Sequence, residues 1–131
     1  MLGITELDEL LRLMEPQLLE EELVFCTVSG SLADYVSLNP IATFFEAEGL
    51  TLVLKKSVAQ KAGFQFEGPF RQIILTVHSS LESVGLTAAV SSKLADKGIS
   101  ANVVAAYYHD HIFVQSAKAE AALSALKEFC R

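Results

Sequence analysis

The chain of 131 residues is long enough for one compact domain, or for two very small units that share a hydrophobic core. Its formal net charge is −6, and Lys55 and Lys56 are its only adjacent basic residues, so we do not expect a nucleic-acid-binding protein. No apolar run approaches the roughly 20 residues of a membrane helix. The N-terminus lacks the basic stretch of a secretory signal, so we expect a cytoplasmic protein without membrane contact.

The first part of the chain predicts a helix and then a strand. Apolar residues at helical spacing predict a helix over residues 4–15, with Thr5 and Asp8 as a capping pair and Pro16 as its end. A run of β-branched and aromatic residues then predicts a strand over residues 23–28.

A hairpin and a short helix are predicted next. Residues 33–40 form at most one helical turn. The apolar runs at 42–45 and 50–54 predict a β-hairpin, and Gly49 supplies its turn. A short helix follows over residues 57–62 and ends at a glycine.

The second half predicts the order β-α-β-β-α. Strands are expected over residues 70–78, 99–108 and 112–114, with His109 and Asp110 as a turn, and Ser116 is expected to cap the final helix. The long helix between the first two strands is expected to bury Leu86, Val90 and Leu94.

The two cysteines are far apart in the sequence. Cys26 lies in an apolar strand-like run and Cys130 in the last helix, so we expect small buried side chains in a reducing compartment, without a metal or redox pair. The chain also lacks a phosphate loop and a dinucleotide-binding glycine pattern, so no cofactor is predicted.

The two halves of the chain resemble each other. Residues 27–32 match residues 76–81, and the aromatic pair Phe44–Phe45 before an apolar strand matches Tyr107–Tyr108 before another. The sequence offset between the halves is larger for the second match than for the first, by about four helical turns. The additional residues are those of the long helix in the second half, where the first half has only residues 33–40.

We therefore predict two diverged copies of one unit, residues 1–68 and residues 69–131, of which the first has lost most of one helix. The N-terminal helix over residues 4–15 is expected to cover the sheet surface that this loss exposed.

The second half resembles the ACT domain family. The whole chain is also similar to small stand-alone bacterial proteins with tandem ACT-like units. This resemblance is carried by residues 84–90, 94–95, 98–103 and 110–114, and by the phrases His-Ser-Ser-Leu at 78–81 and Tyr-His-Asp-His at 108–111.

The resemblance implies an α+β, ferredoxin-like fold of tandem βαββα units, with antiparallel sheets and helices on one face. It also implies that small molecules, often amino acids, bind between ACT units. This sequence departs from the family because the first copy lacks a full first helix and the second ends at Arg131 without a final strand. We expect the first half or a second chain to close the resulting sheet edge.

An amino-acid ligand needs donors for its carboxylate and acceptors for its ammonium group. The start of the long helix offers backbone N–H groups, Gly85 permits close approach, and Asn102 and Asp110 are candidate acceptors if the fold brings them to one edge. The predicted ligand-binding residues are Ser79, Ser80, Ser83, Val84, Gly85, Leu86, Asn102 and Asp110.

Two interpretations of this helix start are open. Ser79 and Glu82 fit a capping box for a helix that begins near residue 80. The family resemblance instead begins the helix near Val84 and leaves residues 79–83 as a loop. Gly85 favours the loop, because glycine inside a helix costs about 1 kcal/mol.

Three histidines provide an alternative. His78, His109 and His111 could bind a metal ion, although a polar hairpin turn also explains His109 and His111.

We predict a non-catalytic module that binds a small molecule, forms a homodimer and regulates a partner in trans. A structural interaction module with a vestigial pocket and a metal-dependent enzyme are the alternatives.

Overall fold

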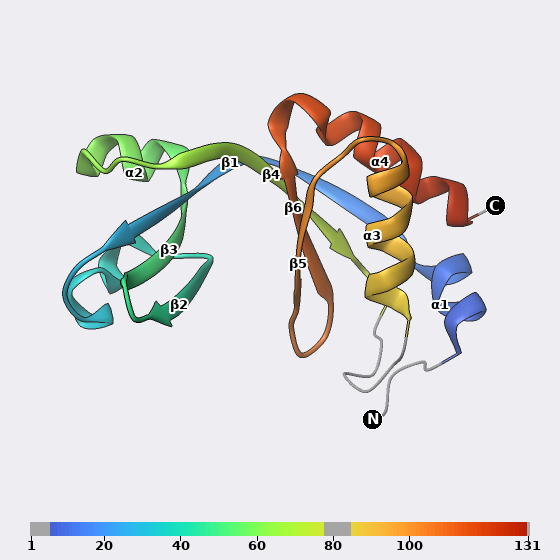
Figure 1. Cartoon of the computed structure of the whole chain (residues 1–131), viewed down its shortest axis with the longest axis horizontal. Helices are drawn as coiled ribbons and strands as arrows, with labels where there is room; N and C mark the ends of the chain where they lie inside the picture. Colours follow the sequence, from blue (N-terminus) through green and yellow to red (C-terminus); the bar gives the residue numbers. More distant parts are fainter. Residues whose placement is uncertain (1–5, 78–84, 131) are drawn as a thin grey trace. The chain divides into compact units, whose positions relative to one another are not determined.

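The structure is a computed structural model that describes residues 6–77 and 85–130 (Figure 1). The described chain divides into two compact units: unit 1 comprises residues 1–20 and 71–131, and unit 2 comprises residues 21–70. None of the described helices is long and apolar enough to cross a membrane. Both units combine β-strands with helices, so the predicted α+β class is confirmed.

Unit 2 has the strand order β2-β3-β1-β4. It contains the β2–β3 hairpin, parts of β1 and β4, and one α-helix. Its elements are β2 (Ala42–Glu46), β3 (Gly49–Lys55), α2 (Lys56–Ala62), the later part of β1 (Pro16–Val28), the first part of β4 (Glu67–Leu75) and two 3₁₀ turns (Leu32–Asp34 and Val36–Leu38). β3 pairs antiparallel with both β2 and β1. The predicted hairpin and the helix that ends at Gly63 are confirmed.

The core of unit 2 lies on one face of this sheet. It contains the alternate residues of β1 and β3 that point toward α2 and the 3₁₀ turns. The buried members are Val24, Cys26, Leu50, Leu52, Leu54 and Ala59. The prediction that Cys26 is buried is therefore confirmed.

Unit 1 has the strand order β1-β4-β6-β5 and three α-helices among its described residues. Its elements are α1 (Leu7–Leu13), the first part of β1, the later part of β4, α3 (Leu86–Asp96), β5 (Ala101–Ala105), β6 (Asp110–Gln115), α4 (Ala119–Lys127) and 3₁₀ turns at Ser116–Lys118 and Glu128–Cys130. The predicted β-α-β-β-α order is confirmed.

The strands β1 and β4 belong to both units. In unit 1, the Arg71 Nε–H donates to the Leu19 carbonyl (3.0 Å), and the Thr76 N–H donates to the Glu15 carbonyl (3.4 Å). In unit 2, the rings of Phe25 and Phe70 meet edge to face at 5.2 Å. The start of β1 therefore stands beside β4 in unit 1, so this sheet edge is closed by the first half, which is one of the two predicted possibilities.

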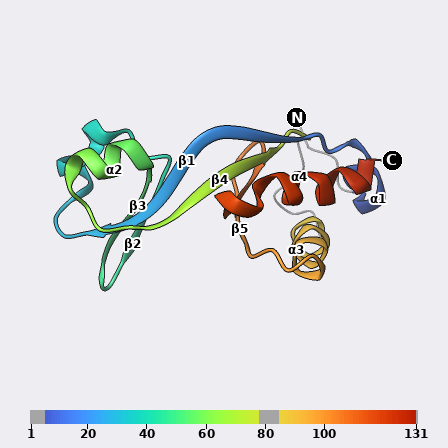
Figure 2. The same cartoon turned by 90° about the horizontal axis from the view of Figure 1, so that it is seen from above.

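The position of α1 differs from the prediction. Leu10 and Met14 are fully buried in one cluster with Val90 and Leu94 of α3 and Leu126 of α4. Figures 1 and 2 both place α1 beside the C-terminal end of α4. The N-terminal helix thus completes the core of unit 1, and the prediction that it covers the sheet of the first copy is wrong. An apolar stripe shows that a helix face is buried but does not identify what covers it.

The helix caps and one turn differ from the predictions. The N-cap of α1 is Glu6 and makes no side-chain cap hydrogen bond. Ser116 does not cap α4, because it begins a 3₁₀ turn and its buried Oγ has no hydrogen-bond partner. The turn predicted at His109–Asp110 begins earlier, since Asp110 is already in β6 and pairs with Ala105.

Strand lengths also differ. β1 begins at Pro16 rather than residue 23, and β5 spans only Ala101–Ala105 of the predicted 99–108. Gly68 and Pro69 lie inside β4 and are joined by a cis peptide bond. Because β5 ends at Ala105, Tyr107 and Tyr108 follow this strand, whereas the matching Phe44 and Phe45 lie within β2.

Candidate ligand-binding site

Gly85 directly precedes α3, whose first residue is Leu86. Gly85 is the N-cap residue of α3 and has φ +97°, in the left-handed region that favours glycine. A Cβ at this position would lie 3.1 Å from Leu7 Cδ2, so Gly85 also permits close packing against α1. Leu86 is buried in the unit 1 core.

Most of the loop predicted to bind the ligand lies outside the described residues. This applies to Ser79, Ser80, Ser83 and Val84, and to His78 of the alternative metal site. Their roles stay predictions. α3 begins at Leu86 with Gly85 as its N-cap, which agrees with a helix start near Val84 and not with one near residue 80.

The two predicted ammonium acceptors lie at different ends of one ladder. Asn102 pairs with Phe113 and Asp110 pairs with Ala105, so three ladder positions, about 10 Å, separate them. The Asn102 side chain donates from Nδ2 to the Phe113 carbonyl at 3.4 Å. These two residues are therefore not brought to one point of the sheet.

Asp110 lies in a polar cluster with two histidines. It is 7% exposed, and this burial raises the pKa of its carboxyl group, against the opposing effect of His111 and His109. His111 Nδ1 is 2.9 Å from Gln72 Nε2, and burial lowers the pKa of this imidazole. Among the described residues, no three His, Cys, Asp or Glu side chains lie together in a way that could hold a metal ion.

The raised pKa of Asp110 predicts a pH-dependent stability. A carboxyl whose pKa is higher in the folded state binds more protons when folded, so its ionisation costs stability as pH rises above the ordinary value of 3.8. We expect Asp110→Asn to be more stable than wild type at pH 7, with a difference that shrinks as pH falls toward 3.8. Urea unfolding of both proteins across this range measures it, and a difference that grows on acidification would contradict the assignment.

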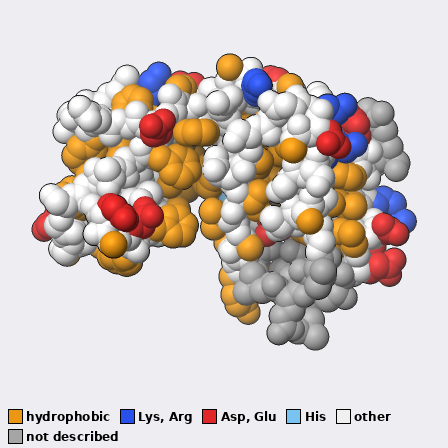
Figure 3. Space-filling view, in the orientation of Figure 1, with side chains coloured by type: hydrophobic (Ala, Val, Ile, Leu, Met, Phe, Trp, Pro, Cys, Tyr) orange, Lys and Arg blue, Asp and Glu red, His pale blue; other side chains and the backbone are white. Residues whose placement is uncertain are grey.

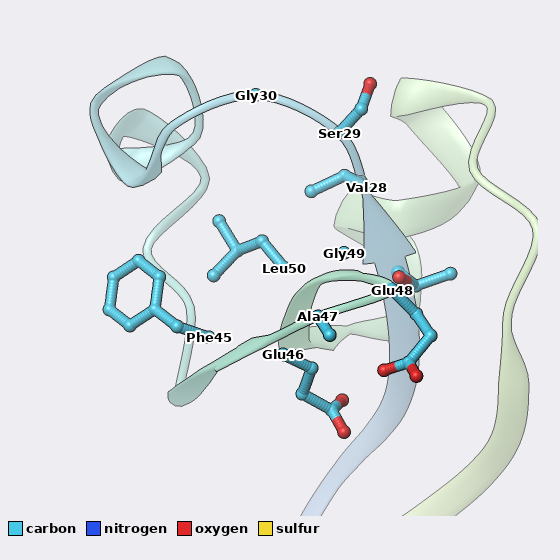
Figure 4. Close-up of a pocket in the computed structure, with 10 residues that line it drawn as sticks. Val28, Ser29, Gly30, Phe45, Glu46, Ala47, Glu48, Gly49 and Leu50 are labelled. Carbon is cyan, nitrogen blue, oxygen red and sulfur yellow. The ribbon is translucent and has the colours of Figure 1, made fainter.

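A surface cavity of about 490 Å³ lies in unit 2, where β1 ends (Figure 4). One wall is the end of β1 and the loop after it, and the other is the β2–β3 turn. Its lining residues are Thr27, Val28, Ser29, Gly30, Phe45, Glu46, Ala47, Glu48, Gly49 and Leu50.

Local hydrogen bonds shape the loop after β1. Gly30 has φ +103°, which turns the chain away from the sheet. The Asp34 carboxylate accepts from the Ser31 N–H at 3.2 Å, and the Tyr35 hydroxyl donates to the Ser29 carbonyl. The 3₁₀ turn at Leu32–Asp34 thereby holds Ser29 and Gly30 opposite the β2–β3 turn.

The cavity has an apolar part and an acidic part. Figure 4 shows the carboxylates of Glu46 and Glu48 on one side of the β2–β3 turn, and Phe45 and Leu50 on the other. Glu46 Oε1 accepts a hydrogen bond of 2.5 Å from the Thr51 hydroxyl. Among the described residues, the lining contains no Lys, Arg or His. The lining is therefore acidic on one side and apolar on the other, without a basic side chain among the described residues.

This cavity in the first copy corresponds, through the sequence repeat, to the loop in the second copy that was predicted to bind a ligand. The match of residues 27–32 with residues 76–81 aligns Thr27–Gly30 with Thr76–Ser79 in the sequence. From the sequence, a site was predicted in the second copy and none in the first. The repeat itself was the signal that could have found it, together with Gly30, two residues after the end of β1.

The comparisons with known proteins are consistent with this architecture. Two sequence families, each described as an ACT domain, match residues 2–71 and 67–128. No curated protein matches the chain.

Several solved structures are similar. A Vibrio cholerae protein of unknown function, described as a possible transport protein, is 60% identical with a TM-score of 0.89, over 95% of this chain and 96% of that one. An Agrobacterium tumefaciens protein is 15% identical with a TM-score of 0.75, over 89% of each chain. The ligand-free regulatory subunit of aspartate kinase from Thermus thermophilus is 12% identical with a TM-score of 0.62, over 88% of this chain and 97% of that one.

The paired ferredoxin-like units and the two matches, which run in tandem along the chain, agree with the resemblance found in the sequence. ACT domains are regulatory ligand-binding modules. This chain belongs to the ACT domain family.

Proposed function

We propose that this protein is a non-catalytic regulatory module that binds a small amino acid and acts on a partner in trans. The observation that supports the proposal is the cavity at the end of β1, because the sequence repeat aligns it with the loop that the residues of the second copy predict to bind a ligand. The proposed homodimer and cytoplasmic location stay predictions.

The groups around the cavity suit an amino acid. Glu46 and Glu48 offer acceptors for the ammonium group. The Ser29 hydroxyl and the exposed backbone of Ser29 and Gly30 offer groups for the carboxylate. Phe45 provides an apolar surface for a short side chain.

A second, equivalent site in the other copy is part of the proposal. Gly85 precedes α3 there, and the helix start offers N–H donors for a carboxylate. The proposal keeps Ser79, Ser80 and Ser83 in this second site as predicted from the sequence.

A melting-shift screen of the twenty amino acids tests the proposal. A ligand at a hundred times its dissociation constant stabilises the folded state by about 2.7 kcal/mol. We expect at least one small amino acid to raise the unfolding midpoint in a concentration-dependent manner. A flat response to all twenty would overturn amino-acid binding and favour a purely structural interaction module.

A further inference from the structure

The strand β2 has one edge without a partner among the described strands. It stands at the end of the strand order and pairs only with β3. Native proteins usually protect such an edge with Lys, Pro or a bulge. The sequence of β2, Ala-Thr-Phe-Phe-Glu, contains neither Lys nor Pro. Its backbone is therefore suited to the addition of an extended segment.

An aromatic groove lies on one face of the unit 2 sheet and runs from β2 across β3 and β1 to the start of β4. Its volume is about 570 Å³, and we call it the Phe44 groove. Phe44 is 46% exposed and Phe45 77% exposed, and exposed aromatic side chains are typical of interaction sites. Its lining residues are Phe25, Cys26, Thr27, Phe44, Phe45, Glu46, Thr51 and Glu67.

The charge at the Phe44 groove is negative. Lys55 and Lys56 of unit 2 already form ion pairs with Glu21 (3.5 Å) and Glu22 (3.6 Å). Within the described part of the chain, Glu46 and Glu67 form no ion pair. Figure 3 shows acidic and apolar side chains next to each other on the visible face of unit 2. Such a surface complements a segment that carries both basic and apolar residues.

We propose that β2 and the Phe44 groove bind an extended basic segment of a partner protein by strand addition. A second copy of this chain fits less well, because it would bring the same acidic groove and a net charge of −6 to the interface. The Phe44 groove shares Thr27, Phe45 and Glu46 with the ligand cavity, so a bound ligand can alter the docking surface. That regulatory coupling rests on the proposed function, whereas segment binding does not.

Fluorescence anisotropy with a short peptide of alternating Lys and Val tests the proposal. We expect saturable binding to the intact chain and no binding of the matching Glu–Val peptide. Phe44→Ser and Glu46→Gln, which both change side chains of β2, should each weaken binding by about tenfold or more. Tyr107→Ser is the matched control, because Tyr107 is an aromatic residue that is 70% exposed at the hairpin of the other unit, and it should leave binding unchanged. Methylation of alternate backbone nitrogens of the peptide should abolish binding, because strand addition needs them.

Three results would overturn the proposal. One is equal binding of the basic and acidic peptides, and another is basic-peptide binding that survives Phe44→Ser or backbone methylation. The third is a homodimer that sedimentation equilibrium detects and that Phe44→Ser dissociates, because it would assign the edge to a second copy. The measurement contains no amino-acid ligand, so its failure is distinct from failure of the melting-shift screen.

Discussion

Leu10→Ala is expected to lower the free energy of unfolding by about 2–5 kcal/mol, the usual cost of truncating a fully buried leucine. Leu10 is 0% exposed and belongs to the same core cluster as Leu94 of α3 and Leu126 of α4. The loss has two causes, the lost burial of apolar surface and the cavity left where the helices meet. Urea unfolding followed by circular dichroism measures it.

Leu13→Ala is the matched control on the same helix. Leu13 is 45% exposed, and we expect its substitution to change stability by no more than about 0.5 kcal/mol. If the two variants were equally stable, α1 would not belong to the core of unit 1, and the interpretation of the N-terminal helix would be wrong.

Gly49→Ala is expected to destabilise the protein by about 1–3 kcal/mol, the usual cost of overpacking. A Cβ at Gly49 would lie 2.7 Å from Thr27 Oγ1 and 3.1 Å from the Val28 carbonyl oxygen. The side chain can move, but the carbonyl belongs to β1 and moves only with the strand. The substitution therefore pushes the β2–β3 turn away from β1 at the cavity.

A double variant separates the two contacts of Gly49. Thr27→Ala removes the hydroxyl, so Thr27→Ala with Gly49→Ala should recover part of the stability but not all of it, and a double-mutant cycle measures the coupling. A single Gly49→Ala variant within about 0.5 kcal/mol of wild type would contradict the close approach of the turn to β1.

The sequence predicted those elements whose pattern is local. The β2–β3 hairpin has a turn glycine between two apolar runs, and α3 buries Leu86, Val90 and Leu94 as its helical spacing indicates. The order of elements in the second half was also predicted correctly.

The first part of β1 could not be predicted in the same way. The residues that open the strand include Pro16 and three consecutive glutamates, and they lack the alternation of a half-buried strand. They form a strand because β4, more than fifty residues later, pairs with them in unit 1. Pairing between distant segments overrides local propensity, and a single sequence does not record it.

The candidate site was predicted only in outline. The repeat located the kind of loop, a strand end followed by a turn glycine, but a site was predicted only in the second copy. The acidic and aromatic lining of the cavity comes from the β2–β3 turn, which the fold brings to the end of β1. Glu48 therefore became a candidate only with the structure.

Isothermal titration of the amino acid that gives the largest melting shift tests the central claim, which is that the cavity at the end of β1 binds a ligand. Glu48 lines this cavity and not the Phe44 groove, whereas Glu67 lines only the groove, and both can be neutralised to Gln with the same change in net charge. We predict that Glu48→Gln weakens binding by about tenfold, or 1.4 kcal/mol, and that Glu67→Gln leaves it unchanged. Equal affinities of wild type and Glu48→Gln would contradict the claim.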